Sequence, residues 1–110
     1  MSVEALWSIR FSALGSHVQG VVIFETNRII GGDSDFYYMG EYQVNDGYLI
    51  GWLRVENYSA SGSLITEGIK PEIFDVSGPI RKGSFQLTGT PRDGDGSKFP
   101  IKFRRLADLP

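Results

Sequence analysis

The chain has 110 residues, of which 41% are hydrophobic and 22% charged, and this predicts one domain, residues 1–110, with a core large enough to fold without cross-links. Because cysteine is absent, disulfides, thiolate metal ligands and a thiol nucleophile are excluded. A net charge of −2 argues against unspecific binding to nucleic acid. The 14 glycines and 13% aromatic residues are typical of short strands joined by tight turns.

The sequence shows no targeting or membrane-spanning segment. Its first residues lack the basic and apolar regions of a leader peptide. The longest apolar run, Val21-Val22-Ile23-Phe24, has the length of a strand and is far below the roughly 20 residues of a membrane helix. We therefore expect a cytoplasmic protein that makes no contact with a membrane.

Alternation of apolar and polar residues with a period of two predicts strands along most of the chain. Five are expected before the middle of the sequence, at residues 6–13, 18–25, 28–31, 36–45 and 48–58, with tight turns at 14–16 and at Thr26-Asn27. A Ser- and Gly-rich loop follows at 59–70, with one helical turn near Leu64-Ile65. Three more strands are expected at 71–77, 84–90 and 98–105, the last two joined by a turn at 93–96.

Eight short strands with no long helix leave two architectures, a sandwich or a barrel. Most of the connections are too short for Greek-key crossings, so they favour an antiparallel up-and-down meander. Closure of this meander into a barrel removes exposed strand edges, which would otherwise pair with other molecules. The predicted fold is an all-β, eight-stranded antiparallel barrel.

The hairpin at residues 36–58 can be read in register. If Asp46-Gly47 form a two-residue type I′ turn, Asn45 pairs with Tyr48 and one uniformly apolar face points inward. The opposite face then carries four apolar residues among charged and polar ones: Tyr37, Met39, Ile50 and Trp52. An apolar cluster rimmed by charges is typical of an interface with a partner or a second copy. The alternative is that the C-terminal tail or the 59–70 loop covers it.

Catalytic and metal-binding patterns are weak in this sequence. His17 is the only histidine, and no Gly-x-Ser-x-Gly spacing accompanies the serines. The segment 93–97 resembles the start of a calcium loop, but Arg104 and Arg105 stand where such a loop needs a glutamate. We therefore expect neither an enzyme nor a bound metal or cofactor.

The basic residues near the C-terminus have two interpretations. Lys98, Lys102 and Arg104 share the outer face of the last strand, with Arg81, Lys82 and Arg92 nearby in sequence. They could form a patch for an acidic partner. An ordinary solvated face that prevents strand pairing is the interpretation we favour from sequence alone.

One stretch of the chain resembles a known family. The segment Arg28-Ile29-Ile30-Gly31-Gly32-Asp33-Ser34-Asp35-Phe36-Tyr37-Tyr38-Met39-Gly40-Glu41-Tyr42, with Leu6–Phe11 and Gly20–Val22, is similar to the negative regulators of type III secretion systems, the GrlR-like proteins. The similarity runs from about residue 6 to residue 106 and is most specific at Gly31-Gly32-Asp33.

The resemblance implies a lipocalin-like (calycin) barrel that dimerises, encloses an apolar cavity and represses by binding a transcriptional activator rather than DNA. The family's type member has an acidic run in the hairpin turn that this chain fills with Val44-Asn45-Asp46-Gly47, so only Asp46 remains of it here. Gly31 and Gly32 are expected at a sharp barrel corner, with Asp33 capping backbone N–H groups there.

Two functions from different classes follow. The first is a dimeric module that binds a regulatory protein through Tyr37, Met39, Ile50 and Trp52, with Asp46 at the turn tip. The second is a carrier for a small apolar ligand, because an eight-stranded barrel can hold one small molecule. The residues that would line such a cavity are Trp7, Phe11, Tyr38, Tyr42, Leu53, Phe85 and Phe103, and plain core packing is the alternative for them.

Overall fold

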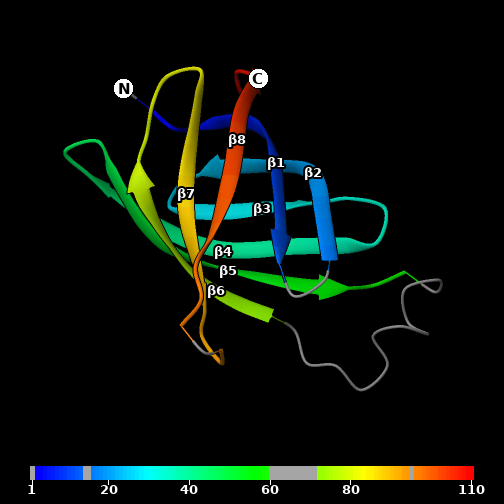
Figure 1. The fold of residues 1–110 in the computed structure, drawn as a ribbon. Coiled ribbons are helices and arrows are strands. Elements are labelled where there is room, and N and C mark those ends of the chain that lie inside the picture. Colours follow the sequence, from blue (N-terminus) through cyan, green and yellow to red (C-terminus); the bar gives the residue numbers. More distant parts are fainter. Residues whose placement is uncertain (1, 14–15, 60–71, 95) are drawn as a thin grey trace.

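The computed structural model describes residues 2–13, 16–59, 72–94 and 96–110. Within these residues, eight strands form one closed barrel, and no helix is present (Figure 1). The strands are β1 (Ala5–Ala13), β2 (Ser16–Glu25), β3 (Arg28–Gly32), β4 (Phe36–Asn45), β5 (Tyr48–Asn57), β6 (Glu72–Pro79), β7 (Ser84–Pro91) and β8 (Phe99–Ala107). The described part of the chain accordingly contains no helix long and apolar enough to cross a membrane.

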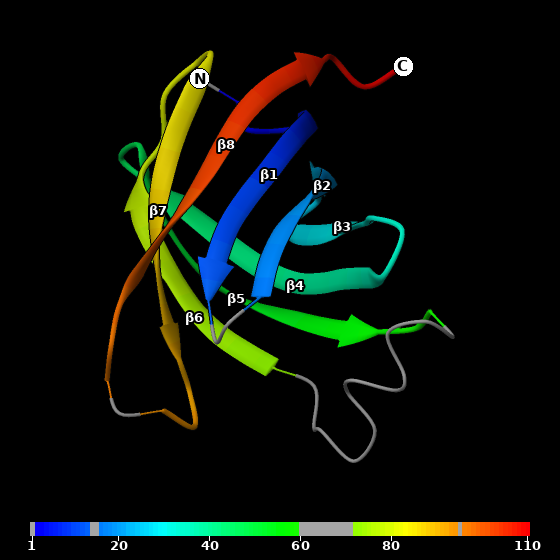
Figure 2. The same cartoon turned by 45° about the vertical axis from the view of Figure 1, so that its right-hand side comes forward.

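Every strand pairs with the next one along the chain, and β1 pairs with β8 to close the barrel. All eight pairings are antiparallel, so the predicted all-β up-and-down barrel is confirmed. In Figures 1 and 2, β7, β8 and β1 form the near wall, and β3, β4 and β5 run across behind them. Strand twist produces this change of direction around a closed barrel.

The predicted strands agree with the observed ones to within about two residues at each end, as expected where strand ends are assigned by different criteria. The largest shifts are at β2, which begins earlier, at Ser16, and at β6 and β8, which end later, at Pro79 and Ala107. Several expectations fall partly or wholly outside the described residues. They are the turn at 14–16, the loop at 59–70 with its helical turn at Leu64-Ile65, the start of the strand at 71 and the turn at 93–96.

The predicted register of the β4–β5 hairpin is confirmed. Asn45 pairs with Tyr48, and the pairing continues without a bulge to Phe36 and Asn57. Asp46 and Gly47 have φ values of 52° and 74°, the two positive values that a type I′ turn requires. The turn at Thr26-Asn27 has the same backbone form, with φ values of 52° and 64°. Two-residue turns thus set the register of two hairpins, β2–β3 and β4–β5.

Candidate interaction surface and barrel interior

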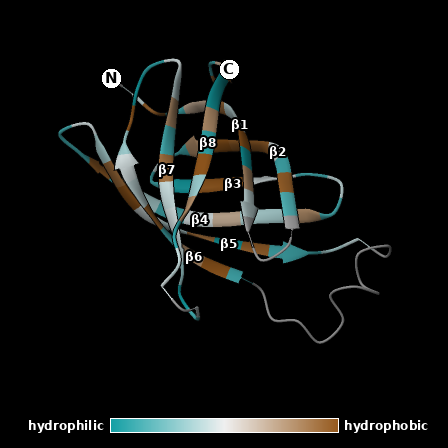
Figure 3. Ribbon diagram, in the orientation of Figure 1, coloured by the Kyte–Doolittle hydropathy of each residue, from teal (hydrophilic) through white to brown (hydrophobic). Residues whose placement is uncertain are grey.

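An apolar row crosses three neighbouring strands on the outside of the barrel. Ile23 of β2 pairs with Ile30 of β3, and Ile30 pairs with Met39 of β4. All three side chains are exposed, Ile30 to 45% and Met39 to 42%. Figure 3 shows hydrophobic stretches along the ribbons of β2 and β3, to which inward- and outward-facing residues both contribute. Directly opposed side chains on one face of a sheet are in contact range, so this row is continuous.

The outer apolar patch, as we name it, extends this row along the strands. Ile50 of β5 is the most exposed large apolar side chain in the described residues, at 61%. Ile50 and Trp52 also border a shallow hollow of about 370 Å³ together with Glu41 and Gln43. The patch consists of Val21, Ile23, Ile30, Tyr37, Met39, Ile50 and Trp52.

The predicted interface residues lie on the outside of the barrel, but they differ in exposure and in the hydrogen bonds that they make. Met39 and Ile50 are exposed without polar atoms of their own. Tyr37 and Trp52 are half-buried, and each donates a hydrogen bond to a carboxylate beside it: the Tyr37 hydroxyl to Glu56, and Trp52 Nε1 to Glu41 Oε1 at 3.2 Å. The hydrogen bond from Tyr37 raises the pKa of that phenol.

Asp46 is separated from the middle of the patch. It lies exposed at the tip of the hairpin, seven strand residues from Met39, or roughly 23 Å along an extended strand. Ile50 lies four residues from Asp46, so only the β5 end of the patch approaches the tip. The structure therefore brings four of the five predicted interface residues onto one surface and leaves Asp46 at its margin.

Sequence reasoning missed Val21, Ile23 and Ile30. The signal was present in the unbroken run Val21–Phe24 and in the pair Ile29-Ile30, because consecutive apolar residues in a strand place an apolar side chain on both faces. Val22, Phe24 and Ile29 are buried in the core, and the residues between them point outward.

Arg54 carries an incompletely satisfied charge beside the patch. It pairs across the strands with Met39, so it continues the apolar row. Its Nε atom is buried and accounts for the one unpartnered buried side-chain nitrogen or oxygen found among the described residues. The nearest carboxylate oxygen, Glu56 Oε2, lies 3.9 Å away, which is an electrostatic contact but too long for a hydrogen bond.

The predicted cavity-lining residues are all buried and largely pack against each other and against one further ring. Phe85 lies between Trp7 and Phe103, with ring centroids 4.8 Å and 5.0 Å apart. Phe24 lies 5.2 Å from Tyr42 and 5.4 Å from Phe103 by the same measure. These are contact distances for aromatic pairs, so the five rings form one packed cluster. Phe24 was not predicted to belong to it.

A second aromatic cluster occupies another part of the interior. Phe11 lies 5.8 Å from Phe74 and 5.5 Å from Phe99, and the rings of Phe74 and Phe99 are 4.9 Å apart. The remaining two predicted lining residues, Tyr38 and Leu53, are at most 1% exposed.

The Gly31-Gly32-Asp33 motif forms a tight corner between β3 and β4. A Cβ added to Gly31 would lie 2.0 Å from the carbonyl oxygen of Val21, so close approach of β2 requires glycine there. Asp33 Oδ1 accepts hydrogen bonds from the backbone N–H groups of Asp35 and Phe36, both at 2.8 Å. The motif therefore has a structural explanation in the described contacts.

Asp33 also accepts hydrogen bonds from the hydroxyl groups of two tyrosines. Its second carboxylate oxygen accepts a hydrogen bond from the Tyr38 hydroxyl, and its backbone carbonyl accepts one from the Tyr58 hydroxyl at 2.7 Å. Burial, together with the hydrogen bond to Asp33, raises the pKa of Tyr38 well above its ordinary value of 10.0. Tyr38 is thereby held as a neutral donor.

His17, which was singled out from the sequence, lies near the start of β2. His17 is exposed, and its Nδ1 lies 2.9 Å from the hydroxyl of Ser12. The described residues contain no group of three or more His, Cys, Asp or Glu side chains placed to hold a metal ion.

Comparisons with models of known protein families and with curated proteins find no match to the chain. The closed eight-stranded barrel is compatible with a lipocalin-like fold. The finer relationship to the negative regulators of type III secretion therefore rests on the sequence resemblance alone.

Proposed function

We propose that the protein is a non-enzymatic regulatory module that binds another protein through its outer apolar patch. In the manner of the GrlR-like negative regulators that it resembles, it would form a homodimer and repress by capturing a transcriptional activator. The observation that carries the proposal is the continuous exposed row Ile23–Ile30–Met39. Contiguous apolar surface of this kind, rimmed by charges, marks protein interaction sites.

Arg54 supports the same surface. Its buried Nε has no hydrogen-bond acceptor among the described residues, although it lies at the end of the apolar row. The Arg54 side chain as a whole is 41% exposed, so it can donate hydrogen bonds to a carbonyl or carboxylate of a docked partner. Arg54 is therefore the polar residue that we expect to meet the partner directly.

Packing in the interior favours this function over that of a carrier. A small-molecule site needs a concave space that buries most of its ligand. The five rings of the first aromatic cluster instead lie within contact distance of each other. The barrel interior is thus occupied by its own side chains where these five rings lie, whereas the apolar row Ile23–Ile30–Met39 is exposed.

The test is native mass spectrometry, with light scattering, of the protein isolated gently from its own host. We expect a dimer for the unmodified chain, a monomer for the double variant Ile30→Ser/Met39→Ser, and loss of any stoichiometric co-purified protein in that variant. Leu106→Ser is the matched control, because Leu106 is 43% exposed on β8, outside the patch. Trp52→Ala should weaken the same assembly.

Each alternative outcome has a definite meaning. An unmodified chain that is a bare monomer, or a double variant with unchanged assembly and partner, would contradict the proposal. A bound mass of a few hundred daltons that is lost on denaturation would favour the carrier.

A further inference from the structure

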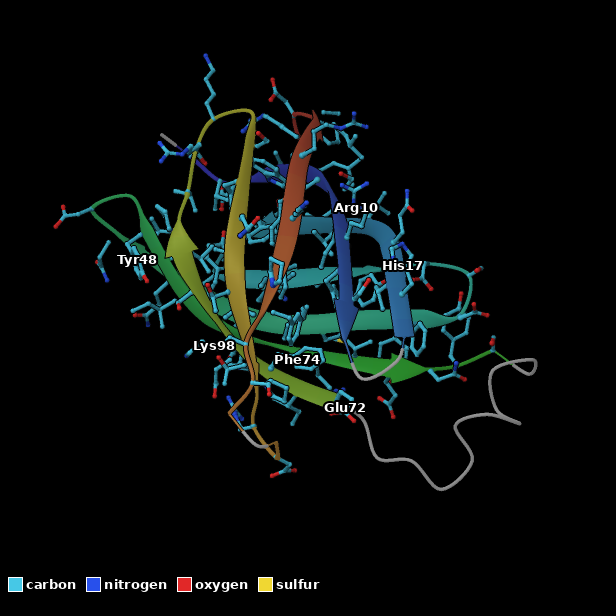
Figure 4. All side chains as sticks on the ribbon, viewed as in Figure 1. Arg10, His17, Tyr48, Glu72, Phe74 and Lys98 are labelled. Carbon is cyan, nitrogen blue, oxygen red and sulfur yellow. The ribbon has the colours of Figure 1, made fainter. Side chains whose placement is uncertain are left out.

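The barrel carries a second surface of opposite character, on the wall formed by β7, β8 and β1. Arg10 of β1 and Lys102 of β8 are direct cross-strand partners, and Arg104 pairs with Ser8 in the neighbouring row. All three cations are exposed. Figure 4 shows Arg10 and His17 at β1 and β2, with Tyr48 at the opposite edge of the view.

These cations line a groove, which we name the cationic groove. One hollow of about 330 Å³ is lined by Arg10, Lys102, Arg104, Ser8, Gln19 and Ser84, among others. An adjoining hollow of about 200 Å³ shares Arg10 and Lys102 and continues toward His17. The hydroxyl and amide side chains add neutral hydrogen-bonding groups around the charges.

Within the part of the chain that the structure describes, no carboxylate forms an ion pair with these cations. The segments of β1, β7 and β8 contain neither Asp nor Glu. The ion pairs found within the described residues join Arg54 to Glu56, Arg92 to Asp75 and Arg105 to Asp108, so none includes a cation of the groove. The chain has a net charge of −2, yet three cations without an ion-pair partner among the described residues lie next to one another on this wall.

Protection of a strand edge does not explain these cations. Lysine and arginine on an edge strand prevent pairing with other molecules. However, β8 is paired with both β7 and β1, and β1 with both β8 and β2, so neither strand is an edge. The closed barrel thus removes protection against strand pairing as an explanation, and an ordinary solvated face is the alternative that remains.

We infer that the cationic groove binds an extended acidic segment of a partner protein. Lys102 and Arg104 are two residues apart on one face of β8, about 6.6 Å, and alternate side chains of an extended segment have the same spacing. Two successive carboxylates of that segment can thus meet Arg104 and the Arg10–Lys102 pair. Six of the eight residues that line the larger hollow are polar or charged, whereas small-molecule sites are lined mostly by apolar side chains.

Nucleic acid fits the groove less well. Single strands are held by stacking on exposed aromatic rings, and the aromatic lining residues Phe11 and Phe103 are buried. Binding to duplex phosphates depends on a strongly positive domain, whereas this chain has a net negative charge. The acidic segment is therefore the occupant that matches both the charge and the shape.

The test uses a fluorescent peptide of alternating glutamate and serine, with a glutamine-serine peptide as its neutral counterpart, and fluorescence anisotropy as the readout. We expect the glutamate peptide to bind more tightly than the neutral one, and an increase from about 20 to about 300 mM salt to weaken it. The double variant Arg10→Gln/Lys102→Gln should weaken binding by about tenfold. Arg81→Gln/Lys82→Gln removes two exposed cations outside the groove and should leave binding unchanged.

Circular dichroism must first show that each variant keeps the strand content of the unmodified protein. Equal binding of both peptides, absence of binding, or unchanged affinity in the groove variant would overturn the inference. So would tighter binding of a thymidine oligonucleotide than of the glutamate peptide. Salt-sensitive self-association that the groove variant abolishes would assign the groove to a second copy instead. Ile30→Ser/Met39→Ser should retain peptide binding, which separates this inference from the proposed function.

Discussion

Tyr37 and Tyr38 are adjacent in the chain, and both donate a hydrogen bond to a carboxylate, yet they lie on opposite sides of the barrel wall. Tyr38 points inward, is fully buried and binds Asp33 at the β3–β4 corner. Tyr37 points outward, is half-buried and binds Glu56 on the neighbouring strand. The same pair of chemical groups therefore occurs once with a fully buried tyrosine and once with a half-buried one.

The difference shows how one hairpin can serve two purposes. On the inner face, burial makes each side chain part of the fold, because its loss leaves a cavity or an unsatisfied group. On the outer face, water replaces a lost contact, so a side chain can change with little effect on stability. Residues of the inner face should therefore report on unfolding, and residues of the outer face on binding.

The largest effect is expected for Tyr42→Ala. Tyr42 is 5% exposed, and its ring packs on Phe24, so truncation should lower the free energy of unfolding by about 3–5 kcal/mol. Tyr48→Ala, at a 47% exposed position of the same hairpin, is the control and should change it by less than about 0.5 kcal/mol. Urea unfolding followed by tryptophan fluorescence measures both. A loss below about 1 kcal/mol for Tyr42→Ala would show that the ring is not packed as described.

A smaller but still large effect is expected for Gly40→Ala. The added Cβ would lie 2.1 Å from the carbonyl oxygen of Trp52, so the backbones of β4 and β5 would have to separate. We expect a loss of about 2–3 kcal/mol in the same urea experiment. Gly83→Ala provides the comparison, since a Cβ there meets nothing within 4 Å. Equal stability of the two variants would contradict the close approach of the strands.

The smallest effects on the free energy of unfolding are expected when Tyr38 and Tyr37 each lose only their hydroxyl group. Tyr38→Phe leaves one oxygen of Asp33 without its donor and should cost about 1–2 kcal/mol at neutral pH. Tyr37→Phe should leave the unfolding midpoint unchanged, because water can reach Glu56.

The effect of Tyr38→Phe should also depend on pH. Because the pKa of Tyr38 in the folded state is raised above its unfolded value of 10.0, its contribution is complete below pH 10.0 and is lost as the pH rises further. The stability difference between unmodified protein and Tyr38→Phe should therefore shrink above pH 10.0. Urea midpoints measured from neutral to strongly alkaline pH test this, and a difference that is constant across the range would contradict it.

Local patterns were sufficient to predict most of the fold. Alternation defined the strands, and Asp46-Gly47 set the register of β4 and β5 because a two-residue turn leaves no freedom in pairing. The four apolar residues of the outer face of that hairpin followed from the same register.

Features that depend on distant pairing could not be predicted in this way. The run Val21–Phe24 indicates an apolar side chain on both faces of β2, but only the burial of Val22 and Phe24 shows which pair faces the core. Arg10 and Lys102 meet only because the first strand pairs with the last, and neither sequence neighbourhood contains a sign of the other. Two of the three residues of the apolar row, Ile23 and Ile30, were therefore not predicted, and the place of Arg10 beside Lys102 required the structure.

The pairing of β1 with β8 also bears on how the molecule reaches its folded state. Every other pairing joins consecutive strands, whereas this one brings Leu6 beside Ala107 and must close a loop of almost the whole chain. Contacts between distant residues form late, because the entropy of loop closure must be lost before they contribute. Hairpins should thus assemble first and the β1–β8 seam last. Since Arg10 and Lys102 lie on the two sides of that seam, the cationic groove should exist only after the final step of folding, and binding of an anionic probe would report that step directly.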